Sequence, residues 1–194
     1  MTEFNFIKIV QAKAQLIAAE LELTDKALTL LEEGVSPAEY IQQLMTNELY
    51  IDVIMFLSAG LSKRESTWWA CLCARSFLTD TSSEFDIKAI ELAEAWVYKP
   101  TPENCKVTLL AAEATEFKSA AGWAAIAAFW SGDDISPNDK AVIPPPADLT
   151  AKAVNGAILL AAVQVDPTKV VENQKKFIMQ GIDIANGGDG RNVK

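Results

Sequence analysis

The chain has 194 residues, half of them hydrophobic and 22% charged, and its formal net charge is −9. This length and apolar content are typical of one domain with its own core. The negative charge argues against nucleic-acid binding, because phosphate backbones are held by basic faces.

The N-terminus lacks the pattern of a secretory signal, because Glu3 stands where a basic region would be and no apolar run follows. The longest charge-free apolar stretches, 119–132 and 153–165, are shorter than the ~20 residues that a membrane span needs. Three cysteines without a signal suit a reducing compartment. We therefore expect a single cytoplasmic domain over residues 1–194 that does not insert into a membrane.

The N-terminal part predicts four helices. Apolar spacing and capping signals place them at about residues 4–23, 25–33, 37–45 and 48–58. The clearest start is Ser36-Pro37-Ala38-Glu39, which combines an N-cap serine, a proline at the first helical position and a glutamate that closes a capping box. Gly34 and Gly60 are expected to end the helices that precede them.

The segment from Ser62 to Leu78 predicts the central helix of the fold. Ser62 and Glu65 form a second capping box, and the residues from Trp68 onward are apolar on nearly every side. A helix with this pattern is buried, since the apolar run is too short for a membrane. Arg75 is the exception, and it must reach water, pair with a carboxylate or contact a ligand. Cys71 and Cys73 are expected to be small core residues.

The C-terminal part predicts five further helices, at about residues 84–98, 102–116, 118–130, 150–164 and 167–186. Residues 131–149 form an irregular connection, because three consecutive prolines, Pro144 to Pro146, impose an extended conformation. The glycine-rich end, residues 187–194, is expected to be a flexible tail. Since no β-period occurs, we expect an all-α fold of about nine helices, packed as antiparallel hairpins or as a superhelical array.

The sequence has no catalytic signature. The absence of histidine excludes His-based triads and His-rich metal sites, and the cysteines lack the spacing of a zinc site. No phosphate-binding or dinucleotide-binding glycine motif is present, so we expect no cofactor. Glu113 and Glu116 share one helix face, and a solvated acidic surface is the simplest interpretation of that pair.

The candidate binding residues are Trp130 with the loop that follows it, Ser131, Gly132, Asp133 and Asp134, together with Arg75. Tryptophan often anchors protein partners, and Trp130 abuts a polar loop where we expect it to be half-exposed. Core packing of Trp130 and a structural ion pair of Arg75 are the alternatives.

Several motifs, taken together, carry a resemblance. They are Arg64 to Ala70, Ala95 to Val97, Ala127 to Gly132, the Pro144–Pro146 run with Ala157 to Ala162 after it, and Gly187 to Arg191. Over residues 36–191 the chain resembles an uncharacterised bacterial family, a domain of unknown function associated with type VI secretion gene neighbourhoods. Members often have Gly-Gly where this chain has Gly132-Asp133. The resemblance implies no catalytic residues.

Three functions are consistent with these observations. The first is a non-catalytic protein-interaction module, an adaptor or accessory protein of a bacterial secretion system, that binds a protein partner in a groove between helices. The second is a small-molecule or enzyme site near Arg75, built with carboxylates such as Glu113 and Asp133. The third is a structural homo-oligomer. We expect the first.

Overall fold

The computed structural model describes residues 4–136, 141–164 and 166–191. These residues contain ten α-helices and no strand, so the predicted all-α class is confirmed. In chain order the helices are α1 (Ala14–Ala18), α2 (Asp25–Thr29), α3 (Pro37–Thr46), α4 (Tyr50–Gly60), α5 (Lys63–Arg75), α6 (Glu84–Tyr98), α7 (Pro102–Ala114), α8 (Ala120–Trp130), α9 (Leu149–Gln164) and α10 (Val170–Ala185), with the 3-10 helix η1 (Pro167–Lys169) before α10.

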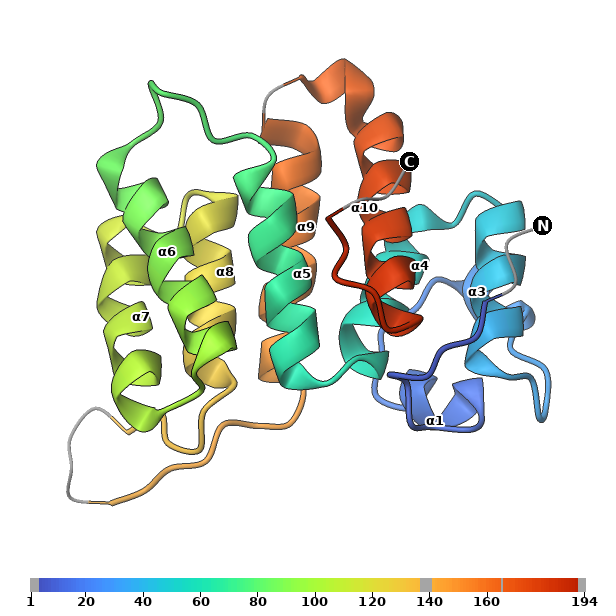
Figure 1. The fold of residues 1–194 in the computed structure, drawn as a ribbon. Coiled ribbons are helices and arrows are strands. Elements are labelled where there is room, and N and C mark those ends of the chain that lie inside the picture. Colours follow the sequence, from blue (N-terminus) through green and yellow to red (C-terminus); the bar gives the residue numbers. More distant parts are fainter. Residues whose placement is uncertain (1–3, 137–140, 165, 192–194) are drawn as a thin grey trace.

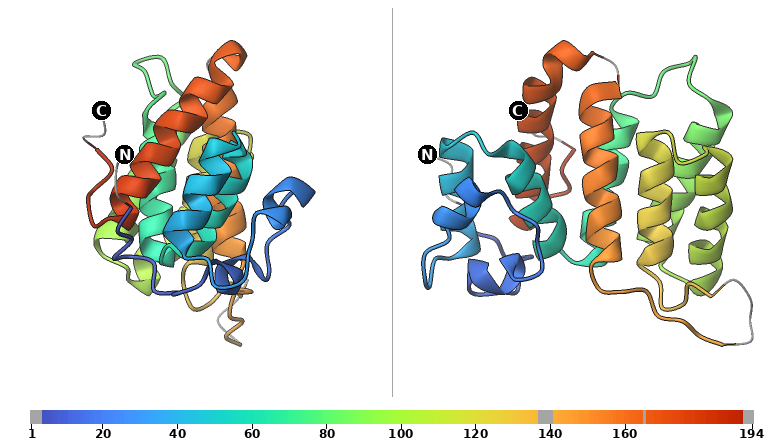
Figure 2. Two further views of the ribbon diagram at one scale, coloured as in Figure 1. Left: turned by 90° about the vertical axis from the view of Figure 1, so that its right-hand side faces the viewer. Right: turned by 180° about the vertical axis from the view of Figure 1, so that it is seen from behind.

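The helices from α4 onward form two layers. Helices α6, α5 and α10 make one layer, and α8, α9 and α4 make the other, as the front and back views show (Figures 1 and 2). Helix α7 closes one end of the array against α6 and α8, and α3 closes the other end against α4. Consecutive helices run in opposite directions (Figure 1), which is the expected antiparallel packing.

Side-chain caps start several of these helices where the sequence predicted. The Ser36 hydroxyl accepts a hydrogen bond from the amide of Glu39, and the Glu39 carboxylate accepts one from the amide of Ser36, which completes the capping box. Ser62, Thr101 and Ser119 accept in the same way at the starts of α5, α7 and α8. Each cap satisfies an amide that the first helical turn leaves free.

Helix α5 lies at the centre, as predicted, and contacts α6, α10, α8 and α9. Trp69 is fully buried, and its indole N–H donates to the carbonyl oxygen of Phe177 on α10 at 2.8 Å. Cys71 and Cys73 are buried free thiols. The helix is less uniformly covered than its sequence suggests, because Trp68 is only partly buried.

The predicted helix over residues 4–23 is wrong, since only Ala14–Ala18 is helical there. The residues before α1 form an arm whose amides bond to distant segments: Lys8 N–H to Ala185 O at 3.0 Å, and Asn5 N–H to the side-chain oxygen of Asn186 at 3.0 Å. Tertiary contacts thus replace the helical hydrogen bonds that the local apolar spacing favoured. The next helix is also shorter than predicted and ends at Thr29, ahead of the turn that contains Gly34.

The tail predicted to be flexible lies, as far as Arg191, against α5 and α10. Asp183 on α10 accepts from the amide of Gly188 through its carbonyl and from the amide of Gly190 through its carboxylate, both at 2.8 Å. Gly190 is buried with φ +73°, a conformation that favours glycine, and a Cβ there would stand 2.8 Å from Leu72 on α5. Residues 192–194 lie outside the described part.

No single helix in the described part of the chain is long and apolar enough to cross a membrane. Helix α9 reaches the required length and composition only when combined with the segment Pro167–Ala185, which is bent by 118° from it.

Candidate functional site

Trp130 and Ser131 join the end of α8 to two other helices. Trp130 is half-buried, and its carbonyl oxygen accepts from the Thr150 hydroxyl at 3.0 Å. The Ser131 hydroxyl donates to the carbonyl of Ala127 at 2.7 Å and lies 3.2 Å from the hydroxyl of Thr67 on α5. These bonds fix the start of the proline-rich connection against α5 and α9.

Of the next three candidate residues, Gly132 and Asp134 stabilise the conformation of the loop, and Asp133 does not. A Cβ on Gly132 would stand 2.5 Å from the Cys105 sulfur, so a side chain does not fit there. The Asp134 carboxylate accepts from the amides of Ile143 and Ser136, each at 2.9 Å, and these bonds lower the pKa of Asp134. Asp133 is exposed. The central part of the connection, residues 137–140, lies outside the described residues.

Arg75 does not join that loop. It lies in the last turn of α5, eight residues beyond Thr67, which corresponds to ~12 Å along the helix. Its guanidinium forms a bidentate ion pair with Glu94 on α6, with both nitrogen–oxygen distances at 2.7 Å, and this pairing raises the pKa of Arg75. The carboxylate partner of Arg75 is therefore Glu94 rather than Glu113 or Asp133. The structure thus has Arg75 in an ion pair between two helices, which was the alternative to a ligand-binding role.

A different site, which the sequence analysis missed, lies at the start of α5. Four separate segments surround a cavity of ≈ 490 Å³ there: the N-terminal arm, the first turns of α5, the end of α6 and the tail. We call it the basic cleft, and its lining residues are Lys8, Ser62, Arg64, Glu65, Trp68, Val97, Tyr98, Gly188, Asp189 and Arg191.

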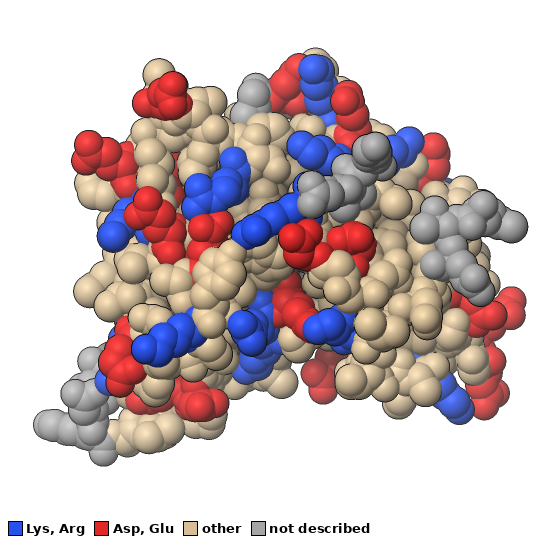
Figure 3. All heavy atoms as spheres, viewed as in Figure 1, with Lys and Arg blue, Asp and Glu red and all other residues tan. Residues whose placement is uncertain are grey.

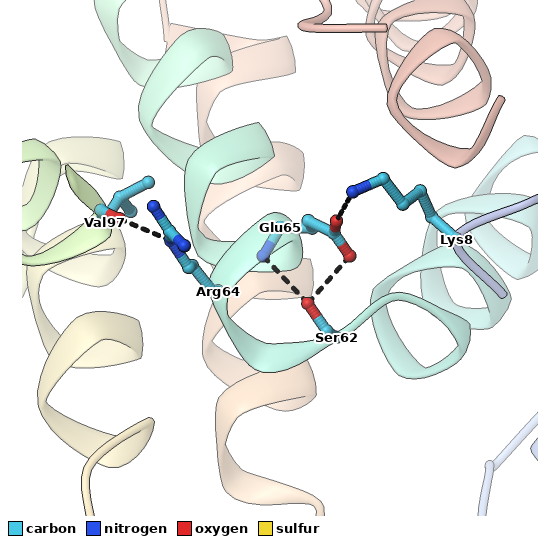
Figure 4. Close-up of polar contacts among 5 residues, drawn as sticks. All are labelled: Lys8, Ser62, Arg64, Glu65 and Val97. Atoms are coloured by element: carbon cyan, nitrogen blue, oxygen red, sulfur yellow. Dashed lines mark hydrogen bonds and ion pairs between the residues drawn. The ribbon is translucent and has the colours of Figure 1, made fainter. Parts of the chain in front are cut away.

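Two of its cations are placed by hydrogen bonds to the ends of α5 and α6 (Figure 4). Arg64 donates from Nε to the carbonyl of Val97, in the last turn of α6, at 2.5 Å. A helix C-terminus favours a cation at that position. Lys8 pairs with Glu65 at 2.6 Å, and the other Glu65 oxygen accepts from the Ser62 hydroxyl at 2.8 Å. Within the described residues, the terminal nitrogens of Arg64 make no further hydrogen bond, so they are available to a ligand.

The third cation belongs to an aromatic cluster. The Arg191 guanidinium lies over the Trp68 ring, 4.8 Å from its centroid, and donates to the Tyr98 hydroxyl at 2.6 Å. The rings of Trp68 and Tyr98 are 5.8 Å apart. The indole N–H of Trp68 donates to the carbonyl of Asp189 at 2.8 Å. The tail is thus held on Trp68 from both sides of Gly190, and Arg191 is fixed at the cleft.

The basic cleft contrasts with the rest of the protein. It holds three cations, Lys8, Arg64 and Arg191, against two carboxylates, Glu65 and Asp189, on a chain whose net charge is −9. Figure 3 shows Lys and Arg side chains near the centre of this face, with carboxylates beside them. Since Glu65 is already bonded to Lys8 and Ser62, the free donors of Arg64 favour an added anion.

The lining of the cleft contains no cysteine or histidine, and the hydroxyl of its one serine, Ser62, serves the cap of α5. Among the described residues, no group of three or more histidine, cysteine, aspartate or glutamate side chains is placed to hold a metal ion.

One sequence signal did point toward this site. Three of the motifs that carried the family resemblance, Arg64 to Ala70, Ala95 to Val97 and Gly187 to Arg191, contribute residues to the same cleft. No pattern within any of them shows that they meet, since 24 residues separate the first from the second and 89 separate the second from the third. Lys8 carried no signal at all.

Comparisons with known proteins agree with that resemblance at the level of the family. A family of unknown function, DUF6931, matches residues 40–185, well over half of the chain. The match includes Arg64, Trp68 and Tyr98 but neither Lys8 nor Arg191. Searches of curated proteins and of solved structures found no match. The chain therefore belongs to the DUF6931 family, whose function is unknown.

Proposed function

We propose that this protein is a non-catalytic interaction module and that its basic cleft binds an acidic segment of a protein partner. The observation that carries the proposal is the convergence of Lys8, Arg64 and Arg191, from three distant parts of an acidic chain, on one cleft that Trp68 also lines. A concentrated cationic site on such a surface selects anions by charge complementarity.

The residue types of the cleft suit a protein partner. Tryptophan, tyrosine and arginine are the residues that most often dominate binding energy at protein interfaces. The guanidinium of Arg64 matches the geometry of a carboxylate, which it can hold through two parallel hydrogen bonds. Trp68 and Tyr98 offer an adjacent apolar surface to the aliphatic part of a glutamate side chain.

The cleft is also largely ordered before binding. Arg64 is held by Val97, and Arg191 is held by Trp68 and Tyr98. Side chains that are already fixed lose less conformational entropy on association than free ones. The tail contacts that fix Arg191 therefore favour binding.

The proposed cellular role follows from the family resemblance. Because the chain resembles a bacterial family associated with type VI secretion, we propose that it acts in the cytoplasm as an adaptor or accessory protein of a secretion system. Trp130 and its loop belong to a different part of the surface, because their polar groups bind α5, α9 and the loop itself. They are not required for the cleft to bind an acidic segment.

Quantitative co-purification from the native host tests this proposal. Three baits are compared. They are the wild-type protein, the double variant Arg64→Ala/Arg191→Ala, and a matched control, Lys26→Ala/Lys88→Ala, which removes the same amount of positive charge from exposed positions elsewhere. The proposal predicts a stoichiometric partner that the cleft variant loses and the control keeps. A partner retained by the cleft variant places binding elsewhere and refutes this site.

A further inference from the structure

A second cavity, of ≈ 510 Å³, lies between the N-terminal arm, the end of α4 and the start of α9. Its floor is apolar and includes Ile17, Leu21, Met55 and Leu61. Its mouth is polar and shares no lining residue with the basic cleft. The volume is within the range of small-molecule sites, ~300–1,000 Å³.

The walls of this cavity are fixed on both sides of α1. A Cβ on Gly60, at the end of α4, would be 3.3 Å from the Ile17 side chain, so α1 packs closely on α4. Beyond the cavity, buried Asp52 accepts from the amide and the hydroxyl of Thr24, at 2.8 and 3.0 Å. The arm therefore forms a preformed wall rather than a loose cover.

Two amide side chains in the lining have an unsatisfied acceptor. The oxygens Gln11 Oε1 and Asn155 Oδ1 are buried and accept no hydrogen bond within the described residues. A buried acceptor without a partner destabilises the protein. Terminal amide torsions are soft, so rotation of either amide toward a donor in the cavity removes this cost. Both amides thus favour an occupant that donates hydrogen bonds.

The charges around the mouth are mixed, with an acidic excess. Glu20, Glu22 and Asp148 face Lys63 and Lys152. Asp148 and Lys152 form an ion pair at 2.6 Å. The hydrogen bond to Asp148 raises the pKa of Lys152, and the negative charge of Glu22 raises it further. Glu20 has no ion pair within the described residues. A cation at the mouth is therefore favoured over an anion of the same size.

From these observations we propose that the cavity binds a small organic ammonium ion with an apolar body. The alkyl part lies on the floor formed by Ile17, Met55 and Leu61. The N–H donors of the ammonium group suit the unsatisfied oxygens of Gln11 and Asn155, and its charge suits the carboxylates at the mouth. This site is independent of the partner-binding role of the basic cleft.

The affinity of the cavity for hexylammonium is measured by calorimetry at neutral pH. Hexanol and hexanoate, which have the same chain length, are the comparison ligands. The proposal predicts that hexylammonium binds most tightly and that hexanoate binds least. In two-dimensional NMR, the side-chain amide signals of Gln11 and Asn155 shift, and the indole signal of Trp68 in the basic cleft does not. Equal binding of hexanoate and hexylammonium, or shifts at Trp68 instead, overturns the proposal.

Two variants test the charge at the mouth and the volume of the cavity separately. Glu20→Gln/Glu22→Gln is expected to weaken hexylammonium binding about tenfold, as loss of a hydrogen bond to a charged group does. The matched control Glu113→Gln/Glu116→Gln removes two exposed carboxylates on and just after α7 and is expected to bind normally. Ala59→Leu narrows the cavity and is expected to reduce binding of both hexylammonium and hexanol. Unchanged binding in either cavity variant, with the fold confirmed by circular dichroism, refutes the site.

Discussion

Gly181 on α10 lies directly against the indole of Trp69 on α5. A Cβ added to Gly181 would stand 2.8 Å from ring atoms Cε2 and Cζ2, and 3.2 Å from Leu57 on α4. The ring itself is fixed by its hydrogen bond to Phe177. The distance between α5 and α10 is therefore set by one glycine and one fully buried tryptophan.

Gly181→Ala is expected to destabilise the protein. Alanine gains ~1 kcal/mol of helix propensity, but overpacking against a fixed ring costs about 1–3 kcal/mol. We expect a net loss of roughly 1 kcal/mol in the free energy of unfolding, measured by urea denaturation. Gly156→Ala is the matched control, because its Cβ would meet only the partly buried Trp123 at 3.2 Å. A Gly181→Ala protein more stable than the Gly156→Ala protein would contradict this account of the core.

Asp134 is expected to hold the proline-rich connection in a pH-dependent way. Hydrogen bonds from Ile143 and Ser136 lower the pKa of Asp134 in the folded protein. The stability that its carboxylate adds to the folded state is therefore complete above the ordinary aspartate pKa of about 3.9. The contribution is lost as pH falls through the lowered pKa. Asp134→Ala should accelerate hydrogen exchange at the Ile143 amide near neutral pH, whereas Asp133→Ala should not. Slow exchange at Ile143 in the Asp134 variant would show that other contacts hold the loop.

The three cysteines are expected to be unreactive in the folded protein. Burial raises the pKa of the Cys71 and Cys73 thiols, and it also raises that of Cys105, which lies beneath Gly132. The nucleophilic thiolate is therefore scarce as well as inaccessible. A thiol-specific colorimetric reagent at pH 8 should label no cysteine without denaturant and three in guanidinium chloride. Rapid labelling of one native thiol would contradict the burial described for it.

The fold was largely predictable because its signals are local. The caps predicted at Ser36, Ser62 and Thr101 depend on residues within one helical turn, and the structure has each of them. The arm before α1 was not predictable, since its apolar residues contact different distant segments. Ile7 meets Gly187, whereas Ile9 meets Gly60, so the helical spacing of these residues does not reflect a helix.

The candidate site was predicted less well, for the same physical reason. Arg64, Tyr98 and Arg191 form one cleft only because α5, α6 and the tail meet there. The sequence favoured Trp130, which abuts a polar loop, over Trp68, which begins an apolar helical run. In the structure Trp68 contacts a guanidinium at an open cavity, while the carbonyl of Trp130 accepts from Thr150.

The most direct test of the central claim is a calorimetric titration of the purified protein with a blocked hexaglutamate peptide. The same peptide built from glutamine provides the neutral control, and added salt tests the electrostatic origin of binding. The account predicts that hexaglutamate binds, that salt weakens the binding and that Arg64→Ala/Arg191→Ala abolishes it, while Lys26→Ala/Lys88→Ala leaves it unchanged. Equal binding of the glutamine peptide, or full binding by the cleft variant, would contradict an acid-binding cleft at Arg64, Trp68 and Arg191.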